Sequence, residues 1–308
     1  MSSSTVKKAL LIGINYTSIP SISLRGCIDD IVNMRNVLID AFGYTQNNII
    51  MLRDDSSSAG LLPTKANIIN ALNTIVAGSN SNQEIWIHYS GHGSQIRDNS
   101  NTSRNGLDDI IVPLDYQHNG FITDIQINNI IKSIQCRAFI IFDSCNSGTI
   151  SDFPWVIQYV SPTSTTKTQI NNSQISNPNI FVFSSCKDNQ NSLDIYDSVA
   201  QQYEGAFTDA FISTLRNNNY NVDILTFYNN VCQWLQQNKF TQTPVLTCPV
   251  STPSYTITRF IPSGYSNVQP SSVSNIVSVS NTNSKKSINN IQTPKQTIKN
   301  NFTSLLSS

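Results

Sequence analysis

Ala138-Phe139-Ile140-Ile141-Phe142-Asp143-Ser144-Cys145-Asn146-Ser147-Gly148 is an apolar run of strand character that ends on a carboxylate, a cysteine and a glycine turn. An upstream stretch has the same form, because the apolar run at 85–89 leads into Ser90-Gly91-His92-Gly93-Ser94. Two buried strands therefore deliver a cysteine and a histidine at their carboxyl ends. A thiol is mostly protonated at neutral pH and needs a base, so the pair predicts a thiol nucleophile beside a histidine.

The hydrophobic periodicity around these stretches predicts an α/β fold. Apolar runs predict strands at 6–14, 49–52, 85–89, 108–113, 138–142, 180–183 and 255–261. Helical spacing predicts helices at 29–42, 63–76, 124–134, 205–215 and 222–235. Strands that alternate with helices indicate a mainly parallel central sheet with helices on both faces. Ligands bind such sheets at the carboxyl ends of the strands, where His92 and Cys145 fall.

Composition excludes several classes of protein. Only 12% of the residues are charged and the formal net charge is zero, which gives no basic surface for nucleic acid. No apolar run reaches the roughly 18 residues that a membrane span needs, and the N-terminus lacks the pattern of a signal peptide. The six cysteines are scattered without a CxxC pair, which argues against zinc and against a disulfide framework. We expect a cytoplasmic protein with neither nucleic-acid nor membrane partners.

The chain divides by composition into a folded region and a tail. Residues 1–262 carry the periodic segments, with a polar, flexible connection predicted at about 161–178. Residues 263–308 are rich in Ser and Asn, contain no acidic residue and are predicted to be disordered.

A single cysteine after a buried strand is more often a packing residue than a nucleophile, and His88, inside its strand, is interpreted as structural. The joint pattern favours a catalytic role for His92 and Cys145, because each lies in a Gly/Ser turn where a packing residue gains little. The amide groups of Gly93 and Cys145 are then candidates to hold a developing oxyanion.

Five blocks of sequence, taken in order, resemble the type I metacaspases, which are caspase-like cysteine peptidases of clan CD. The blocks are 9–16, 24–30, 89–95, 143–149 and 184–192, within a match from about 6 to 262. The Gln-Ala-Cys-x-Gly signature of true caspases is absent. The pattern also lacks the N-terminal prodomain of many relatives, so we expect no activation by prodomain recruitment.

The resemblance implies a caspase-hemoglobinase fold, a His92–Cys145 dyad and cleavage of peptide bonds after Arg or Lys. It places the pocket for the basic side chain on Cys27, Asp30, Ser90 and Asp143. Two carboxylates in a cleft suit a guanidinium or ammonium group. Taken alone, Asp30 could simply stabilise a helix N-terminus and Asp143 could cap a strand end, but together they favour the pocket.

The resemblance also implies a calcium site, because many metacaspases need calcium. The family's site maps onto Asp108, Asp124 and Asp152. Relatives usually have a second acidic residue after the position of Asp124, and this chain has Ile125 there. Calcium takes six to eight oxygen ligands, so we expect weaker binding here.

Some metacaspases cut themselves after a basic residue in the polar connection, which makes Lys167 a candidate for self-processing, although an ordinary solvated lysine is at least as good an interpretation. The hypothesis is a monomeric, calcium-stimulated cysteine endopeptidase that acts on proteins or peptides after Arg or Lys. Two alternatives stay open at this point: a non-catalytic caspase-fold protein for binding or quality control, and a peptidase that prefers acidic or neutral residues.

Overall fold

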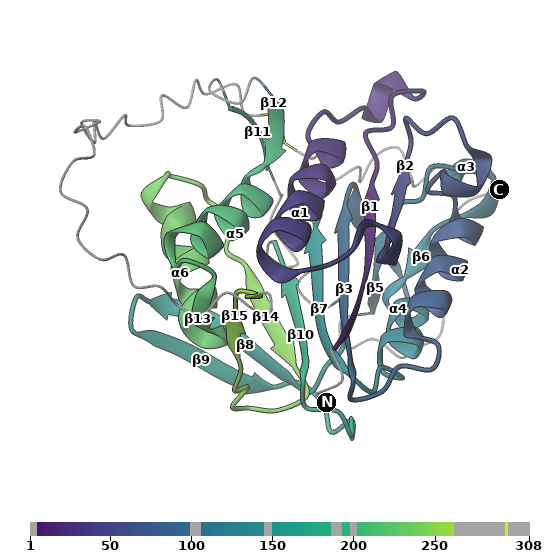
Figure 1. Cartoon of the computed structure of the whole chain (residues 1–308). Coiled ribbons are helices and arrows are strands. Elements are labelled where there is room, and N and C mark those ends of the chain that lie inside the picture. The colour runs from purple at the N-terminus through teal and green to yellow at the C-terminus, as the bar shows by residue number, and fades with distance from the viewer. Residues whose placement is uncertain are drawn as a thin grey trace.

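The computed structural model describes residues 5–98, 106–144, 150–185, 193–197, 202–261 and 293–294, with backbone alone for 193–197, 202–204 and 293–294. Its main sheet is built from β1 (Val6–Gly13), β2 (Ile49–Arg53), β3 (Gln83–Ser90), β7 (Arg137–Asp143), β8 (Trp155–Ser161), β9 (Ser164–Gln169), β10 (Ile180–Ser184) and β14 (Val245–Cys248). The strand order is β2-β1-β3-β7-β10-β14-β8-β9 (Figure 1). The first five strands in this order run parallel, and β14, β8 and β9 extend the sheet antiparallel.

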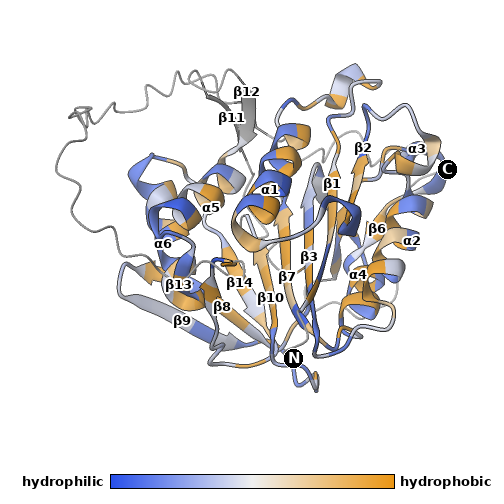
Figure 2. Ribbon diagram, in the orientation of Figure 1, coloured by the Kyte–Doolittle hydropathy of each residue, from blue (hydrophilic) through white to orange (hydrophobic). Residues whose placement is uncertain are grey.

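The parallel strands are continuous buried runs rather than alternating ones. In β3 and β7 every residue after the first is buried, and β10 is buried throughout. This is the pattern of strands covered on both faces, and it explains why the apolar runs predicted these strands correctly. Figure 2 shows the hydrophobic colour concentrated in the central strands, while the helices are hydrophilic on one side only.

Helices cover both faces of the sheet, as predicted. One face carries α1 (Cys27–Phe42), α5 (Ala206–Asn217) and α6 (Ile224–Gln237), and the other carries α2 (Lys65–Val76) and α4 (Asp124–Ile131). The short helices are α3 (Tyr116–Asn119), η1 (Pro20–Ile22), η2 (Gln46–Asn48) and η3 (Ala59–Leu61). α1 ends at Gly43, whose φ of 71° is the left-handed conformation that glycine adopts readily at a helix end.

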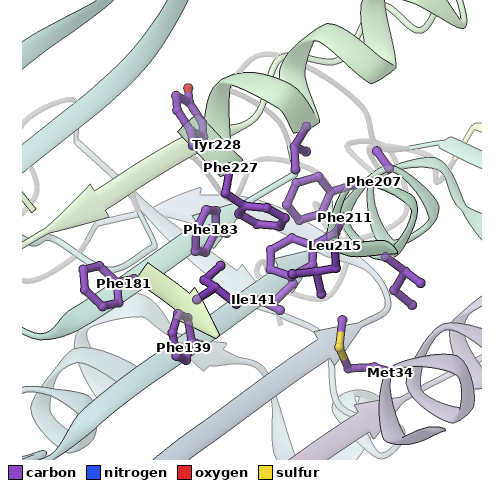
Figure 3. Packing of buried hydrophobic residues seen from close by; sticks show 14 of the residues in the cluster. Met34, Phe139, Ile141, Phe181, Phe183, Phe207, Phe211, Leu215, Phe227 and Tyr228 are labelled. Atoms are coloured by element: carbon purple, nitrogen blue, oxygen red, sulfur yellow. The ribbon is translucent and has the colours of Figure 1, made fainter. Parts of the chain in front are cut away.

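Two hydrophobic cores hold these layers together. The core under α1, α5 and α6 is rich in aromatic side chains, among them Phe139, Phe183, Phe211 and Phe227 (Figure 3). The core on the other face is mostly aliphatic and packs α2 and α4 against the strands. Each face of the sheet is therefore anchored independently.

In the described part of the chain, three smaller sheets lie beside the main one. β4 (Gly93–Arg97), β5 (Leu107–Ile111) and β6 (Ile122–Thr123) pair antiparallel, as do β13 (Asn221–Asp223) and β15 (Thr256–Thr258). The third consists of β12 (Gln202–Gly205), β11 (Leu193–Asp197) and β16 (Thr293–Pro294). β12 leads directly into α5, which matters for the site described below.

The polar segment 161–178, predicted as a flexible connection, contains a strand that was not predicted. Its first part contains β9, which pairs antiparallel with β8, and β8 itself was not predicted. β9 is almost wholly exposed, so it joins the sheet through backbone pairing and leaves no apolar pattern in the sequence. β4 and β14 were missed as well, whereas the expected strand at 255–261 shortens to β15.

The predicted disorder of 263–308 falls on residues outside the described part of the chain, apart from the backbone of β16. None of the helices in the described ranges combines the length and the apolar character that crossing a bilayer requires.

Candidate active site

His92 lies between β3, which ends at Ser90, and β4, which begins at Gly93. In the parallel pairing of β3 with β7, Ser90 stands opposite Asp143, and the Gly91 amide donates to the Asp143 carbonyl at 3.3 Å. A Cβ on Gly91 would come within 2.6 Å of the Tyr89 hydroxyl, so this position must be glycine. The carboxyl ends of β3 and β7 therefore lie side by side at His92.

The His92 ring is held in one tautomer. Its Nε2 is 2.7 Å from the Ile22 carbonyl oxygen, and the ring is 2% exposed. Because a carbonyl can only accept a hydrogen bond, Nε2 carries the proton and donates it. The neutral ring then has its lone pair on Nδ1, which makes Nδ1 the basic atom.

Two buried tyrosines hold the backbone of His92. The Tyr89 hydroxyl donates to the His92 carbonyl at 2.7 Å, and the His92 amide donates to the Tyr16 hydroxyl at 3.1 Å. The Tyr16 hydroxyl donates in turn to the Val112 carbonyl at 2.6 Å, and the Tyr16 ring packs on the imidazole with centroids 4.8 Å apart. Burial raises the pKa of Tyr16 well above its usual value, so the phenol stays protonated. Sequence reasoning did not single out either tyrosine.

Cys145, predicted as nucleophile and as an oxyanion donor, lies outside the described residues. The residue before it is held firmly, because the Ser144 amide donates to the Ser185 hydroxyl at 3.2 Å and this hydroxyl donates to the Ser144 carbonyl at 2.9 Å. Ser185 follows β10, so the end of β7 is tied to the neighbouring parallel strand.

The amide of Gly93 is oriented by the pairing of β4 with β5. Gly93 stands opposite Ile111, and the Val112 amide donates to the His92 carbonyl at 3.2 Å. Because this hydrogen bond joins the residues next to the pair, Gly93 and Ile111 themselves form a non-hydrogen-bonded antiparallel pair. The Gly93 N–H therefore points away from β5.

Three of the four predicted pocket residues are brought together. Asp30, Ser90 and Asp143 are fully buried, and the Ser90 hydroxyl donates to Asp30 Oδ2 at 2.6 Å. A Cβ on Gly205 would overlap Asp143 Oδ2 and lie 2.8 Å from Asp30 Oδ2, so the two carboxylates are near neighbours. The fourth residue, Cys27, lies one turn before Asp30 in α1, with its side chain in the core beside Tyr16.

The three predicted calcium ligands form an acidic cluster. Asp108 is on β5, Asp124 begins α4, and Asp152 precedes β8 with a φ of 42°. Burial, followed by the charges of Asp152 and Asp108, raises the pKa of Asp124 to about 7. Burial also raises the pKa of Asp108, with contributions from Asp98 and Asp152. The carboxylates thus repel one another in the absence of a cation.

The donor set of this cluster fits a hard cation, although it is not gathered around one point. Within the described ranges, Asp108 Oδ1 is buried without a hydrogen-bond partner. The Asn128 amide donates to Asp152 Oδ2 at 3.2 Å. Among the described residues, no three His, Cys, Asp or Glu side chains lie close enough together to hold a metal ion. Asp98 and Asn128 are members of the cluster that sequence reasoning missed.

Lys167, the predicted self-processing position, is an exposed residue of β9 and stands opposite Ile157 of β8. It therefore belongs to a paired edge strand rather than to an open loop.

Comparisons with known proteins agree with this architecture. The family model for the metacaspase, peptidase C14 domain matches residues 7–154. Metacaspase-1 from Debaryomyces hansenii is 33% identical over 79% of this chain and 64% of its own length. Metacaspase-1 from Scheffersomyces stipitis is 32% identical over 79% of this chain and 70% of its own length. The chain thus spans roughly two thirds of the length of these two relatives.

A solved structure supports the fold separately. Caspase-1 from Spodoptera frugiperda superposes with a TM-score of 0.50 at 13% identity, covering 79% of this chain and 88% of the insect protein. At such low identity the superposition bears on the fold alone. It confirms the caspase-like α/β architecture. With two curated relatives above 30% identity and the matching family model, the chain belongs to the metacaspases, the caspase-like family of cysteine peptidases.

Proposed function

We propose that this protein is a cysteine endopeptidase that cleaves after Arg or Lys, with Cys145 as nucleophile and His92 as base, and that calcium stimulates it. One observation carries the proposal: the strand pairing that positions His92 also gathers Asp30, Ser90 and Asp143 into a buried acidic group. A base and an anionic pocket at the same sheet edge suit a substrate with a cationic side chain next to its scissile bond.

The tautomer of His92 defines the proton path. Nδ1 takes the proton from the Cys145 thiol, and the thiolate attacks the peptide carbonyl to form a tetrahedral intermediate. The imidazolium then gives this proton to the leaving amine as the C–N bond breaks. Water hydrolyses the resulting thioester with His92 again acting as base. The Ile22 carbonyl keeps its bond to Nε2–H throughout and stabilises the positively charged ring.

The oxyanion of the tetrahedral intermediate would be held by the amides of Gly93 and Cys145. The orientation of Gly93 N–H away from β5 supports this role. Losing one such donor typically removes about 3–4 kcal/mol of transition-state stabilisation.

Calcium would bind at Asp108, Asp124 and Asp152, with Asp98 and Asn128 beside them. The buried Asp108 oxygen and the raised pKa of Asp124 support a cation site. When bound, calcium would supply the positive charge that offsets the repulsion between these carboxylates. Ile125, in place of an acidic residue, leaves the set one ligand short and favours weak binding.

The test is hydrolysis of a fluorogenic Arg-ending peptide while calcium is titrated from zero to millimolar. Cys145→Ala and His92→Ala should each lower kcat/KM by a factor on the order of 10⁴, with circular dichroism showing that both proteins are folded. A panel of peptides varied before the scissile bond should rank Arg and Lys first.

Each outcome is distinct. Turnover that Cys145→Ala retains would rule out the proposed nucleophile, and a preference for acidic or neutral residues would rule out the pocket. A folded wild type that hydrolyses no peptide at any calcium concentration would instead favour a caspase-fold binding protein.

A further inference from the structure

The first turn of α5 makes hydrogen bonds to both pocket carboxylates. The Gly205 amide donates to Asp30 Oδ1 at 2.7 Å. The Thr208 amide and hydroxyl donate to Asp143 Oδ2 at 3.1 and 2.8 Å. Asp30 belongs to α1 and Asp143 to β7, so one helix end joins two acidic groups that reach it from different elements.

α5 has no capping side chain of its own. Its N-cap is Gly205, and Asp143 accepts from Thr208 at the third helical position, where a Ser or Asp N-cap would normally accept. The N-terminal end of a helix dipole also stabilises negative charge. The donors at this helix end therefore fix one oxygen of each carboxylate in place.

Gly205 leaves no space between the helix end and the carboxylates. A Cβ there would overlap Asp143 Oδ2, and the next closest atom is Asp30 Oδ2 at 2.8 Å. Neither carboxylate can yield as a flexible side-chain end would, because both are fully buried and hydrogen-bonded. Any side chain at this position must therefore displace one or both carboxylates.

The helix that carries these donors is rigidly anchored. Phe211 of α5 packs edge-on against Phe183 of β10 and Phe227 of α6, at centroid distances of 5.3 and 4.6 Å (Figure 3). Phe207, one turn earlier, is fully buried beside Phe211. The Thr208 hydroxyl accepts in turn from His88 Nε2 at 3.3 Å, which fixes its hydrogen toward Asp143.

We propose that Gly205 and Thr208 are specificity-determining positions that hold Asp30 and Asp143 ready for a basic side chain. The inference rests on the proposed function and deepens it. A carboxylate offers about four acceptor sites, so each can keep its bond to α5 while it binds a guanidinium. Both residues act through the carboxylates, and they are therefore positioning residues.

The experiment measures guanidinium binding and catalysis separately. Agmatine, a small guanidinium compound, is titrated by calorimetry, and KM and kcat are measured with the fluorogenic Arg-ending peptide. Gly205→Ala should raise both the agmatine Kd and KM about tenfold or more, while kcat changes less than about threefold. The matched control is Gly60→Ala, because a Cβ at Gly60 meets nothing within 4 Å.

Two variants of Thr208 distinguish the loss of its hydroxyl from general misfolding. Thr208→Val keeps the shape of the side chain but loses the hydroxyl, and it should raise the agmatine Kd about fivefold to tenfold. Thr208→Ser restores the hydroxyl and should recover most of the binding. Equal binding by the Val and Ser variants, or wild-type binding by Gly205→Ala, would overturn the inference.

The same data separate this inference from the proposed function. Wild-type protein that binds agmatine without hydrolysing any peptide would contradict the peptidase and leave the positioning role intact. Hydrolysis of Arg peptides with no response to the Gly205 and Thr208 variants would contradict the positioning role alone. Wild type that binds no agmatine would overturn the positioning role.

Discussion

His92 is positioned through its backbone as much as through its ring. Tyr16 accepts from the His92 amide, Tyr89 donates to the His92 carbonyl, and Ile22 accepts from the ring. Tyr16 itself has a φ of 52°, a conformation that non-glycine residues rarely adopt. These contacts fix the orientation and the tautomer of the imidazole, as the proposed role of general base requires.

Tyr16→Phe tests this arrangement. Phenylalanine keeps the ring against His92 but removes the hydroxyl that joins His92 to Val112, so the buried His92 amide loses an acceptor. We expect the free energy of unfolding to fall by about 1–3 kcal/mol and kcat/KM to fall about tenfold. Urea denaturation and peptide hydrolysis measure the two effects.

Tyr159→Phe is the control, because the Tyr159 hydroxyl bonds Gln236 of α6 rather than any part of the site. It should leave kcat/KM unchanged. Full activity in Tyr16→Phe would show that the ring alone positions His92.

The raised pKa of Asp124 predicts that the stability of the calcium-free protein depends on pH. Burial raises its pKa to about 7, whereas a carboxyl in the unfolded chain ionises near pH 4. The folded state therefore holds a proton that the unfolded state has released between these values. The contribution of Asp124 to the free energy of unfolding is present below about pH 4 and is lost as pH rises through 7. In EGTA, Tm should fall more steeply between pH 5 and about 8 in wild type than in Asp124→Asn.

Bound calcium should oppose this loss of stability with rising pH, because the ion binds the ionised carboxylate. The apparent calcium affinity should weaken about tenfold between pH 8 and about pH 6, and Asp124→Asn should weaken it further. Asp40→Asn, at an exposed position of α1, is the matched control. Calcium affinity that does not vary with pH would place the ion elsewhere.

At the scale of elements, the pairing of β9 with β8 bears on the proposed self-processing at Lys167. A peptidase binds its substrate in an extended form within the cleft, and Lys167 is already paired with β8. β9 must leave the sheet before Lys167 can enter an active site, although as an exposed edge strand it has few side-chain contacts to lose.

We expect slow cleavage after Lys167 when calcium is added, slower than the hydrolysis of a short Arg-ending peptide. Mass spectrometry of the fragments should locate the cut, and Lys167→Ala should abolish it. Lys239→Ala, at another exposed lysine, should leave it unchanged. The same fragments in Cys145→Ala would mean that a contaminating protease makes the cut.

Sequence reasoning succeeded where the signal is local. β3 and β7 are built around apolar stretches, and their carboxyl ends lead to His92 and Asp143, so both the strands and the shared sheet edge could be predicted. β9 was missed because it buries almost no side chain. Gly205 and Thr208 were missed because their hydrogen-bond partners lie more than sixty positions away, and a glycine before a helix looks like an ordinary N-cap.

At the scale of the whole molecule, the two ends of the parallel strands carry different groups of side chains. The carboxyl ends of β3 and β7 carry His92 and Asp143. The amino ends carry Glu84 and Arg137, where Arg137 Nη2 is 2.7 Å from a Glu84 oxygen. Lys7 of β1 lies 3.7 Å from the same carboxylate, and the Tyr44 hydroxyl donates to it at 3.0 Å. This cluster ties β1, β3 and β7 to the end of α1, far along the strands from the proposed chemistry.

Glu84→Gln should therefore separate stability from function. The substitution removes a carboxylate that is only 6% exposed and leaves two partly buried cations without their counter-ion. We expect the free energy of unfolding to drop by about 2–4 kcal/mol, since breaking a buried pair from one side leaves an uncompensated charge. KM for the Arg-ending peptide should stay within about twofold of wild type, because Asp30 and Asp143 sit at the other end of the sheet.

Asp55→Asn provides the comparison, because it removes the partner of Arg53 in an ion pair whose side chains are 30% and 46% exposed. A pair so well solvated contributes about 0–1 kcal/mol. Urea denaturation of both variants, with KM measured in parallel, should show a large stability loss only for Glu84→Gln. A change in KM as large as that of Gly205→Ala would mean that the amino end of the sheet is coupled to the pocket, and that the two ends do not act independently.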